Sequence, residues 1–548
     1  MKKQKLGNLR KFANQYYPQQ ITAQDASTKY KNGEHKPYNI LLNTFDETRT
    51  KRESIKPGKA VAHWFMRDLR VRDNNGLSHA NKLALKNGIP MLCFWVHCPE
   101  MELAHNVGDF QKYYRFLSLH QLQEKLAKLN INLIIVKAER RADIIPQVLQ
   151  LLQKYGVSHL FSNLEYEVDE LRLATTAMTK FLEEKVSFTP CHNSCVVLPG
   201  ALKTKSKGTQ YAVFSPWFRA WMAYVDQELF SKEHFEYDSP IKLEKRLSVS
   251  QQELEIPDVD VDKERFHKYW KMIGEDGALE QLAEYIESDE INKYKDERDF
   301  LDLESVSNMS VHISSGTIST RTILQELRQN KKMKNLHTLK TSGVFEWIRQ
   351  ISWRDFYKHI ICYWPYVCMF KPFHLEYDDL SWEYDEDHFE RWCLGNTGFP
   401  IVDACMRCLN ETGYLNNRGR LIVASFLSKN LLIDWRNGEQ YFLSKLIDSD
   451  FCSNNGGWGF ASSTGVDPQP YFRIFNPWTQ SERFDPDGEF IKKWVPELVD
   501  VSPKMLHKET SDPLCANYTA PIVSHKETRS RALEKYKAAM EEGRKKNL

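Results

Sequence analysis

Short apolar segments alternate with amphipathic segments between residues 60 and 184. The apolar segments are AVAHWF, PMLCFWV, INLIIV and SHLFS, which begin at residues 60, 90, 131 and 158. The amphipathic segments occupy residues 77–86, 109–129, 142–154 and 169–184. Continuous apolar runs of this length are typical of strands buried on both faces, and strands that alternate with helices build a parallel sheet. We therefore expect an α/β domain over residues 59–190, a parallel sheet with helices on both faces.

Further along the chain the apolar pattern takes a helical period. One predicted helical face carries Phe345, Ile348, Ile351, Phe356 and Ile360, and another carries Leu421, Ser425, Leu432 and Trp435. Glycine or proline at residues 395, 398, 400, 413 and 438 is expected to separate helices. The pattern predicts a large all-helical domain over residues 266–500, preceded by a polar surface connector over residues 191–265.

Both ends of the chain differ from the middle. Residues 1–58 are expected to form an extension, which begins with Lys2, Lys3, Lys5, Arg10 and Lys11 and has no acidic residue before Asp25. This charge pattern suits a targeting segment or a basic arm, and a solvated tail equally well. Residues 501–548 are polar and end in KYKAAMEEGRKKNL, which predicts a short charged helix or a frayed end.

Composition narrows the class of protein. The net charge of the 548-residue chain is only +2, so binding to nucleic acid would require basic side chains gathered on one face. No apolar run is long enough to predict a membrane span. Cys405 and Cys408 form a C-x-x-C without a second pair, which favours buried thiols of an intracellular protein over a metal site. No G-x-G-x-x-G follows the first apolar segment.

Tryptophan is abundant and unevenly distributed. Nine of the fourteen tryptophans lie between Trp347 and Trp494. Such a cluster suits a large aromatic core, and it also suits stacking on planar partners or electron transfer. Composition alone leaves these alternatives open.

Residues 395–477 resemble the photolyase/cryptochrome family in a long and nearly gapless match, from GNTGFPIVDACMRCLNETGYLNNRGR to NNGGWGFASSTGVDPQPYFRIFNP. The segment WFMRDLRVRDN from residue 64 resembles the first strand and loop of that family, and the resemblance covers about residues 60 to 500. The chain is similar to class I cyclobutane pyrimidine dimer photolyases of the fungal, yeast-like type. This implies an antenna-binding α/β domain, a helical domain that holds FAD, and light-driven electron transfer from reduced FAD to a flipped dimer in UV-damaged double-stranded DNA.

The resemblance assigns a set of flavin-binding residues. Clustered hydroxyls over residues 305–317 suit a diphosphate at a helix start, although a capped helix is the ordinary explanation of such a cluster. The family usually has Thr where this chain has Val306, so one hydroxyl contact to phosphate is in doubt. Arg420 resembles the arginine that pairs with Asp448. The implied flavin-binding residues are Tyr294, Val306, Ser307, Asn308, Met309, Ser310, Arg420, Asp448, Ser449, Asp450 and Asn454.

Four residues are implied to act in electron transfer. Asn454 matches the residue that faces the reactive edge of the flavin, where an amide can hydrogen-bond a reduced ring nitrogen and cannot ionise. Cryptochromes commonly carry Asp or Cys there, so Asn454 favours repair over signalling. Trp382, Trp435 and Trp458 match the family's photoreduction chain, which runs from the surface at Trp382 to the flavin at Trp458.

The segment QISWRDFY places Gln350, Trp353, Arg354 and Tyr357 on one side of a predicted helix. Trp353 resembles the tryptophan that packs on the flipped dimer. Photolyases are among the enzymes that flip their target base, and base–aromatic stacking returns roughly 1–3 kcal/mol per base. The other implied DNA-binding residues are Asn417, Arg418, Gly419, Arg420, Leu421, Phe460 and Arg473, with Arg354, Arg418 and Arg473 as phosphate contacts.

Two positions depart from the common bacterial pattern. Gln350 stands where Glu is frequent, which puts in doubt any step that needs charge or a proton there. Phe460 stands where a second Trp is frequent, so the stacking surface remains and the indole donor is lost. Members that repair (6-4) photoproducts carry paired histidines where this chain has Asn416 and Asn417, so cyclobutane dimers are the expected lesion.

His105, Asp169, Glu170 and Cys368 align with positions that hold a folate antenna, and we expect methenyltetrahydrofolate rather than a deazaflavin. Asp169 stands where Asn is common, and unrelated surface residues are the alternative reading. Two other functions remain open: a cryptochrome photoreceptor that signals through a partner protein, and a DASH-type enzyme for single-stranded DNA. The chain is expected to be a monomer in the nucleus, with the mitochondrion as a second compartment.

Overall fold

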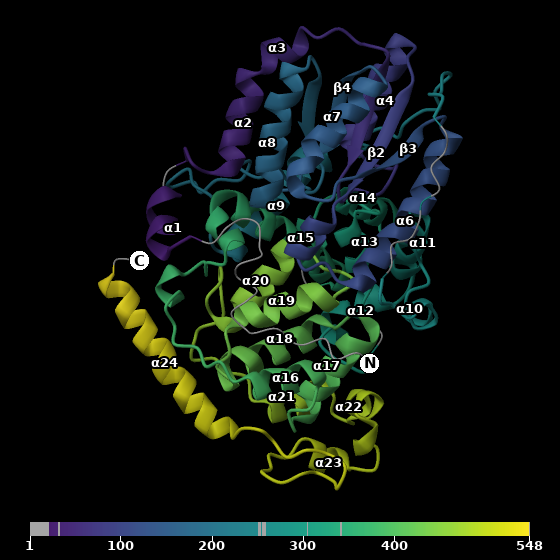
Figure 1. Ribbon diagram of the computed structural model, residues 1–548. Helices are drawn as coiled ribbons and strands as arrows, with labels where there is room; N and C mark the ends of the chain where they lie inside the picture. Colours follow the sequence, from purple (N-terminus) through teal and green to yellow (C-terminus); the bar gives the residue numbers. More distant parts are fainter. Residues whose placement is uncertain are drawn as a thin grey trace. The chain divides into compact units, whose positions relative to one another are not determined.

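The computed structural model describes residues 21–30, 33–249, 254, 259–303, 305–339 and 342–546. The chain divides into two compact units (Figure 1). The sheet unit comprises Asn32–Asn292 and Ser307–Pro365, and the helical unit comprises Met1–Lys31, Lys293–Val306 and Tyr366–Leu548. Among the described residues, no helix combines the length and the apolar character that crossing a membrane requires.

A five-stranded sheet forms the centre of the sheet unit. All neighbouring strands are parallel, in the order β3-β2-β1-β4-β5. The strands are β1 (Ala60–Phe65), β2 (Met91–His97), β3 (Asn132–Lys137), β4 (Val157–Asn163) and β5 (Ser187–Cys191). The first four match the predicted apolar segments. The sequence pattern missed β5, because an edge strand is half-exposed and tolerates polar residues and a proline such as Pro190.

Helices cover both faces of this sheet, which confirms the predicted α/β fold. On one face α4 (Asn75–Asn87) and α6 (Asp109–Lys128) share a core with Val61 and Cys93. On the other face α8 (Val168–Glu183) packs Phe181 against Phe188 of β5, with the ring centroids 5.9 Å apart. Helix α7 (Ile144–Lys154) contacts β3 and β4.

Helix α2 (Pro37–Glu47) lies alongside α8 (Figure 1). Its Tyr38 is buried, contacts the ring of Tyr166 edge-on at 6.0 Å, and donates a hydrogen bond to the Pro199 carbonyl at 3.2 Å. The predicted extension over residues 1–58 is therefore wrong for its second half, which is part of the folded unit. The basic residues between Lys2 and Lys11 lie outside the described residues.

The predicted surface connector over residues 191–265 is also wrong at its centre. Helix α9 (Phe214–Tyr224) buries Phe214, Trp217 and Trp221. The spacing of these aromatic residues is that of a helix face that packs inward, and the polar residues on either side of α9 hid this pattern.

The sheet unit contains seven further helices over its described residues, of which the last is the longest. They are α3 (Arg49–Glu53), α5 (Pro99–Ala104), α10 (Lys263–Tyr269), α11 (Gly274–Glu287), α13 (Ser310–Ser315), α14 (Thr320–Asn330) and α15 (Gly343–Tyr363). Helix α12 (Glu290–Glu297) runs in sequence from the sheet unit into the helical unit. Ser342 caps α15, because its hydroxyl accepts a hydrogen bond from the Phe345 amide.

The helical unit is built from ten helices over its described residues, so a helical domain does follow the sheet. Its bounds differ from the predicted residues 266–500, because residues 266–292 and 307–365 belong to the sheet unit. The ten helices lie in the helical unit's described part. They are α1 (Ala23–Lys29), α16 (Glu386–Leu394), α17 (Pro400–Thr412), α18 (Asn417–Ser425), α19 (Trp435–Lys445), α20 (Phe451–Ser462), α21 (Pro477–Phe484), α22 (Glu489–Trp494), α23 (Pro503–Leu506) and α24 (His525–Lys545). Gly395 and Gly413 end α16 and α17 in the left-handed conformation, and Pro400 begins α17. Cys405 and Cys408 are buried free thiols in α17.

Two predicted features of this unit are wrong. Gly438 does not separate helices but lies inside α19, where it makes room for the ring of Trp458. Leu421, Ser425, Leu432 and Trp435 do not share one helix face. After α18 the chain makes a π turn at Phe426–Asn430, Leu432 takes a positive φ of 53°, and Asp434 caps the new helix α19.

The C-terminal residues form a packed helix rather than a frayed end. Helix α24 buries Tyr536, whose hydroxyl donates to the Ser462 carbonyl at 2.7 Å. Arg531 of the same helix donates to the Asn430 carbonyl at 2.8 Å and pairs with Glu383 at 2.7 Å. These contacts anchor α24 on the π turn and on the end of α20.

Candidate functional site

Arg420 and Asp448 form the ion pair that the resemblance implied. Arg420 Nη2 lies 3.0 and 2.8 Å from the two carboxylate oxygens of Asp448, and Arg420 Nε donates to the Leu415 carbonyl at 2.7 Å. Asp448 is buried, and so are the next two residues, Ser449 and Asp450. A charge-assisted pair of this kind fixes the loop before α20.

Asp450 and Asn454 continue this arrangement into α20. Asp450 caps the helix, because its carboxylate accepts a hydrogen bond from the Ser453 amide at 3.1 Å. The Asn454 side chain donates from Nδ2 to the Glu439 carbonyl at 3.0 Å. With Nδ2 held on a carbonyl, Oδ1 of Asn454 is turned away from Glu439 and is available to accept a hydrogen bond.

Glu439 is a buried acid on α19 that the sequence did not single out. Its Oε1 accepts a hydrogen bond from Asn455 Nδ2 at 2.8 Å, and its carbonyl accepts the one from Asn454. Burial raises the pKa of Glu439 to about 7. Burial therefore keeps this carboxyl in its neutral form up to a higher pH than an exposed glutamate would stay neutral.

The three tryptophans assigned to electron transfer differ in their surroundings. Trp458 is buried in α20 and contacts Phe442 and Trp392, with ring centroids 5.1 and 6.1 Å apart. Trp435 is buried at the start of α19, with the guanidinium of Arg436 4.9 Å from its ring. Trp382 is half-buried, and its ring lies edge-on to Tyr536 at 6.1 Å.

The hydroxyl-rich segment after Tyr294 is divided between the two units. Tyr294 and Val306 belong to the helical unit, whereas Ser307, Asn308, Met309 and Ser310 belong to the sheet unit. Ser307 Oγ accepts a hydrogen bond from Trp347 Nε1 at 3.2 Å, and the Ser307 carbonyl accepts one from Gln281 Nε2 at 2.6 Å. The segment is therefore fixed by its neighbours before helix α13 begins at Ser310.

In the sheet unit, α15 holds the residues expected to contact the lesion. Trp353 lies face to face on Phe214 of α9, and Tyr357 lies 5.4 Å from Trp353. Gln350 Nε2 donates to Glu346 Oε1 at 2.9 Å, which leaves its carbonyl oxygen as the natural acceptor.

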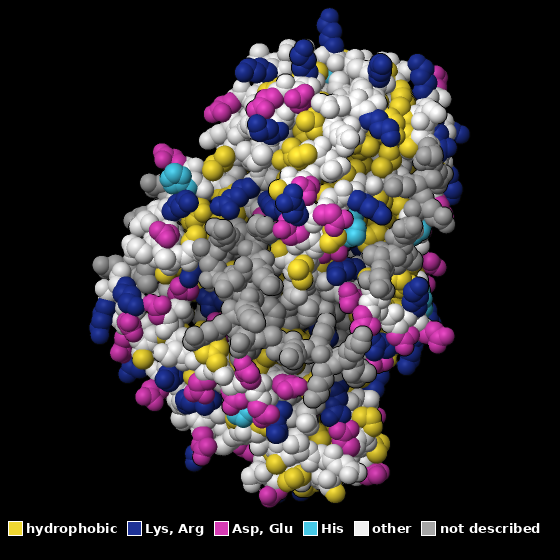
Figure 2. Space-filling model, in the orientation of Figure 1, with side chains coloured by type: hydrophobic (Ala, Val, Ile, Leu, Met, Phe, Trp, Pro, Cys, Tyr) yellow, Lys and Arg dark blue, Asp and Glu magenta, His cyan; other side chains and the backbone are white. Residues whose placement is uncertain are grey.

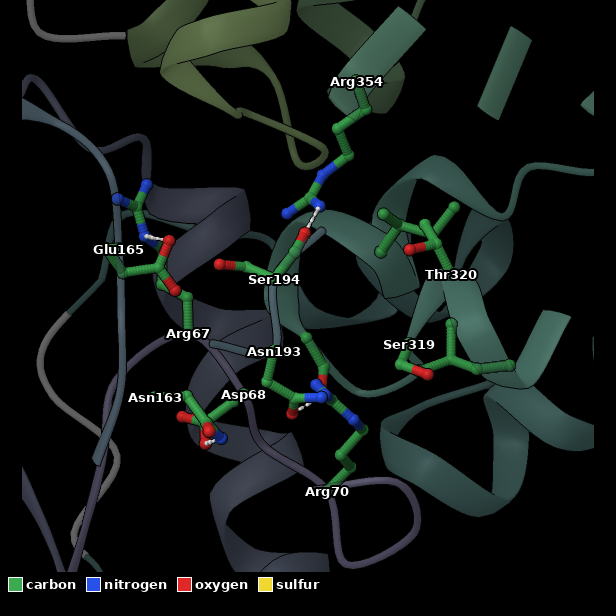
Figure 3. A pocket seen from close by; sticks show the side chains of 13 residues that line it. Arg67, Asp68, Arg70, Asn163, Glu165, Asn193, Ser194, Ser319, Thr320 and Arg354 are labelled. Atoms are coloured by element: carbon green, nitrogen blue, oxygen red, sulfur yellow. Dashed lines mark hydrogen bonds and ion pairs between the residues drawn. The ribbon is translucent and has the colours of Figure 1, made fainter. Parts of the chain in front are cut away.

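Arg354 does not project freely from α15. Its Nη1 donates to the Ser194 carbonyl at 2.6 Å, and both residues line a pocket at the carboxyl ends of β1, β4 and β5 (Figure 3). In the same pocket, Arg70 donates to Asn193 Oδ1 at 2.5 Å, while Arg67 lies 3.6 Å from Glu165. This is the sheet edge where α/β folds bind ligands. The cavity measures about 20 Å³, which is space for about one water molecule.

The predicted DNA-contacting residues of the helical unit are also engaged within it. Arg418 Nη2 pairs with Asp299 Oδ2 at 2.7 Å, and its guanidinium lies 4.3 Å from the centre of the Phe484 ring. Asn416 caps α18 and donates to the Arg298 carbonyl at 3.1 Å. Asn417, Gly419 and Leu421 follow in that helix.

The segment after α20 is tied down by a buried lysine. Lys429 Nζ donates to Ser463 Oγ at 2.8 Å and to the Arg473 carbonyl at 3.0 Å. Burial lowers the pKa of Lys429 to about 7. The backbone of Arg473 is therefore fixed, and Phe460 lies one turn before Ser463 in α20.

On the face shown in Figure 2, Lys and Arg are interspersed with Asp and Glu.

Three of the four residues expected to hold an antenna meet in the sheet unit. His105 Nε2 lies 2.7 Å from Asp169 Oδ2, and Arg141 Nη1 lies 3.1 Å from the same oxygen. Burial alone would raise the pKa of Asp169, but His105 and Arg141 hold it well below its usual value. Burial and the neighbouring Asp169 raise the pKa of Glu170. Cys368 is a buried thiol of the helical unit.

Sequence reasoning missed three residues that contact or fix the candidate site residues: Phe214, Lys429 and Glu439. Only Phe214 had a readable signal, because FSPWFRAW carries aromatic residues at positions i, i+3, i+4 and i+7. Lys429 and Glu439 read as ordinary charged residues, and only the tertiary structure shows that they are buried.

Known proteins resemble this chain along most of its length. A protein-family sequence model described as DNA photolyase matches residues 61–235, and a second one, described as the FAD binding domain of DNA photolyase, matches residues 347–538. The chain is 41% identical to a deoxyribodipyrimidine photo-lyase of Neurospora crassa, over 97% of this chain and 89% of that protein. It is 36% identical to a mitochondrial deoxyribodipyrimidine photo-lyase of Saccharomyces cerevisiae, over 96% of this chain and 94% of that protein.

Solved structures agree with these relatives. A bacterial class III photolyase of Agrobacterium tumefaciens superposes with a TM-score of 0.76 at 30% identity, covering 89% of this chain and 99% of that one. A cryptochrome of Synechocystis superposes with a TM-score of 0.74 at 25% identity, covering 87% and 98%. From the two matched regions and the near full-length relatives we conclude that the chain belongs to the DNA photolyase family.

Proposed function

We infer that this chain is a deoxyribodipyrimidine photo-lyase, which uses light to reverse cyclobutane pyrimidine dimers in DNA. Its relatives in Neurospora crassa and Saccharomyces cerevisiae carry that name. The observation that carries the inference is Asn454, a neutral amide in the first turn of α20, one turn after Asp450. Its Nδ2 is held by the Glu439 carbonyl, so Oδ1 can accept from a reduced flavin nitrogen.

The donor and acceptor groups around Asn454 fit FAD. When bound, the reduced cofactor supplies the electron that splits the dimer after it absorbs light. We propose that Asp448, Ser449 and Asp450 bind the ribityl chain and the ring, and that Arg420 balances the charge of Asp448. The hydroxyl and backbone groups at Ser307 and Ser310 suit the diphosphate. Trp382, Trp435 and Trp458 are proposed to restore the reduced state by passing electrons inward.

The lesion is proposed to stack on Trp353, while Gln350 recognises the pyrimidine edge through its carbonyl oxygen and its second N–H. Because an amide carries neither charge nor an exchangeable acid proton, Gln350 supports binding and no proton transfer. Asn416 is occupied as a helix cap, so neither it nor Asn417 supplies the acid–base pair that a (6-4) photoproduct requires.

The test is a repair assay on two defined substrates. Purified protein should reverse a cyclobutane dimer in duplex DNA under blue light, and it should leave a (6-4) photoproduct unchanged. Dark incubation is the control for the light requirement. Repair of the (6-4) product alone would refute the assigned lesion. Repair of dimers in single-stranded DNA but not in duplex DNA would instead favour a DASH-type enzyme.

The similarity to a Synechocystis cryptochrome keeps a second function in view, a flavin photoreceptor that signals through a protein partner. The same assay separates the two functions, because a pure photoreceptor would bind flavin without splitting the dimers into pyrimidines. Asn454 supports repair, since signalling members commonly carry an ionisable residue there.

We further propose methenyltetrahydrofolate as the antenna, bound by His105, Asp169, Glu170 and Cys368. The raised pKa of Glu170 favours its protonated carboxyl, which can both donate to and accept from a pterin edge, and Asp169 is held by His105 and Arg141 beside it. Folate added to the purified protein should introduce a second near-ultraviolet band, and Glu170→Leu should remove it without changing the flavin spectrum.

A monomer in the nucleus, with a mitochondrial fraction, completes the proposal. The Saccharomyces relative is named mitochondrial, and the basic residues between Lys2 and Lys11 suit targeting to either compartment. Fluorescent fusions with and without residues 1–20 test the compartment, and sedimentation of the purified protein tests the monomer.

A further inference from the structure

Phe214 and Trp353 form a closely stacked aromatic pair within the sheet unit. Their ring centroids lie 3.5 Å apart, and the ring planes are only 5° from parallel. Phe214 begins α9 and is 1% exposed, whereas Trp353 is half-buried in the middle of α15. A residue of the supposed connector therefore covers one face of the side chain to which lesion stacking is assigned.

The Phe214 ring is itself fixed by several aromatic neighbours. Phe218, one turn later in α9, stacks on it at 5.5 Å and 10°. Phe356 of α15 meets it edge-on at 5.5 Å and 82°, and the guanidinium of Arg349 lies 5.7 Å from its centre. Rings packed from several directions have little rotational freedom, so Phe214 provides a rigid platform.

The orientation of Trp353 follows from these contacts. Phe214 covers one face of the indole, and Phe356 lies edge-on to it at 83°. The ring of Tyr357 lies 5.4 Å from it with the two planes tilted by 31°. A planar partner that stacks on this indole must use the face opposite Phe214. Stacking depends on parallel planes, so any tilt of the indole would weaken binding of both pyrimidines of a dimer.

We propose that Phe214 is a positioning residue for lesion binding, which holds the indole plane of Trp353 before the dimer enters. This inference rests on the proposed function, in which Trp353 stacks on the flipped dimer. Phe214 does not touch DNA in this scheme. Its contribution is preorganisation: a side chain already held in its binding orientation loses less freedom when the ligand binds.

The experiment compares four variants of the full-length, flavin-loaded protein with the wild type. Phe214→Leu keeps the apolar volume and removes the flat ring, while Phe214→Tyr keeps the ring. Trp353→Leu removes the indole ring that is proposed to stack on the dimer. Phe235→Leu is the matched control, because Phe235 is also buried and stacks on Phe230 at 5.8 Å, away from Trp353.

Three quantities are measured for each variant: dark affinity for a duplex with one dimer, dark affinity for the undamaged duplex, and the repair rate at saturating DNA. For Phe214→Leu we expect dimer affinity about tenfold weaker, a fraction of what base stacking contributes. Affinity for undamaged DNA, flavin content and the saturated repair rate should stay near wild type. Phe214→Tyr and Phe235→Leu should both bind the dimer normally.

Two results would overturn the proposal, and they differ from one another. If Phe214→Leu binds the dimer like wild type while Trp353→Leu does not, Phe214 is only a core residue and the proposed function stands. If Trp353→Leu also binds the dimer normally, then Trp353 does not stack on the lesion, and the proposal for Phe214 fails as well. Should Phe214→Leu fail to retain flavin, Phe214→Met serves in its place, because it also lacks a flat ring and its unbranched, flexible side chain adapts to irregular space.

Discussion

Replacing Gly438 with alanine should disturb Trp458 specifically, because Gly438 lies inside α19 with no room for a side chain. A Cβ atom there would fall well within van der Waals contact of Trp458 Cη2 and only 2.6 Å from Leu427 Cδ2. Trp458 has little space to retreat, since Phe442 and Trp392 lie against it at 5.1 and 6.1 Å. The indole must therefore tilt, or α19 and α20 must move apart.

The size of the effect follows from two opposing contributions. Overpacking a filled core costs about 1–3 kcal/mol. Alanine in a helix interior recovers about 1 kcal/mol relative to glycine. The free energy of unfolding of the helical unit should fall by up to about 2 kcal/mol. Light-driven reduction of oxidised flavin should also slow, because Trp458 is the proposed donor next to the flavin.

The assay follows urea unfolding and photoreduction on the same preparations. Ser444→Ala is the control, because Ser444 lies in the same helix and its hydroxyl bonds only to the nearby Tyr441 carbonyl among the contacts described. That variant should change both quantities little. If Gly438→Ala is as stable as wild type and reduces flavin at the same rate, then the Trp458 ring does not lie against α19.

Three further outcomes are expected. Arg420→Gln leaves the buried Asp448 carboxylate without its cation, so the flavin content should fall and the free energy of unfolding should drop by roughly 3 kcal/mol. Adding Asp448→Asn to this variant should restore part of the lost stability. Glu439→Gln should flatten the pH dependence of stability between about pH 4.5 and 7: the raised pKa of Glu439 means that the wild type loses up to about 3 kcal/mol as pH rises through that window, whereas the amide does not titrate. Trp458→Phe should slow photoreduction of oxidised flavin and leave repair by pre-reduced enzyme largely intact, and equal loss of both would contradict its role as an electron donor.

The α/β fold was predictable because it is encoded locally. Each of β1 to β4 is a short apolar run, and each covering helix repeats its apolar residues every three or four positions. Helix ends at Gly395, Pro400 and Gly413 were also readable, since these residue types have conformational preferences of their own. The family resemblance added the list of candidate site residues, which periodicity alone does not provide.

Burial and long-range pairing were decided only by the tertiary structure. Gly438 read as a helix boundary because glycine is a helix breaker, but the space needed by Trp458 outweighs that local preference. The aromatic face of α9 was hidden among polar neighbours, although it meets α15 through the Phe214–Trp353 stack. Lys429 and Glu439 read as solvated charges, and their lowered and raised pKa values arise because distant segments exclude water from them. Local sequence thus determined which elements form, whereas contacts between residues far apart in the chain determined which side chains are buried, oriented and shifted in pKa.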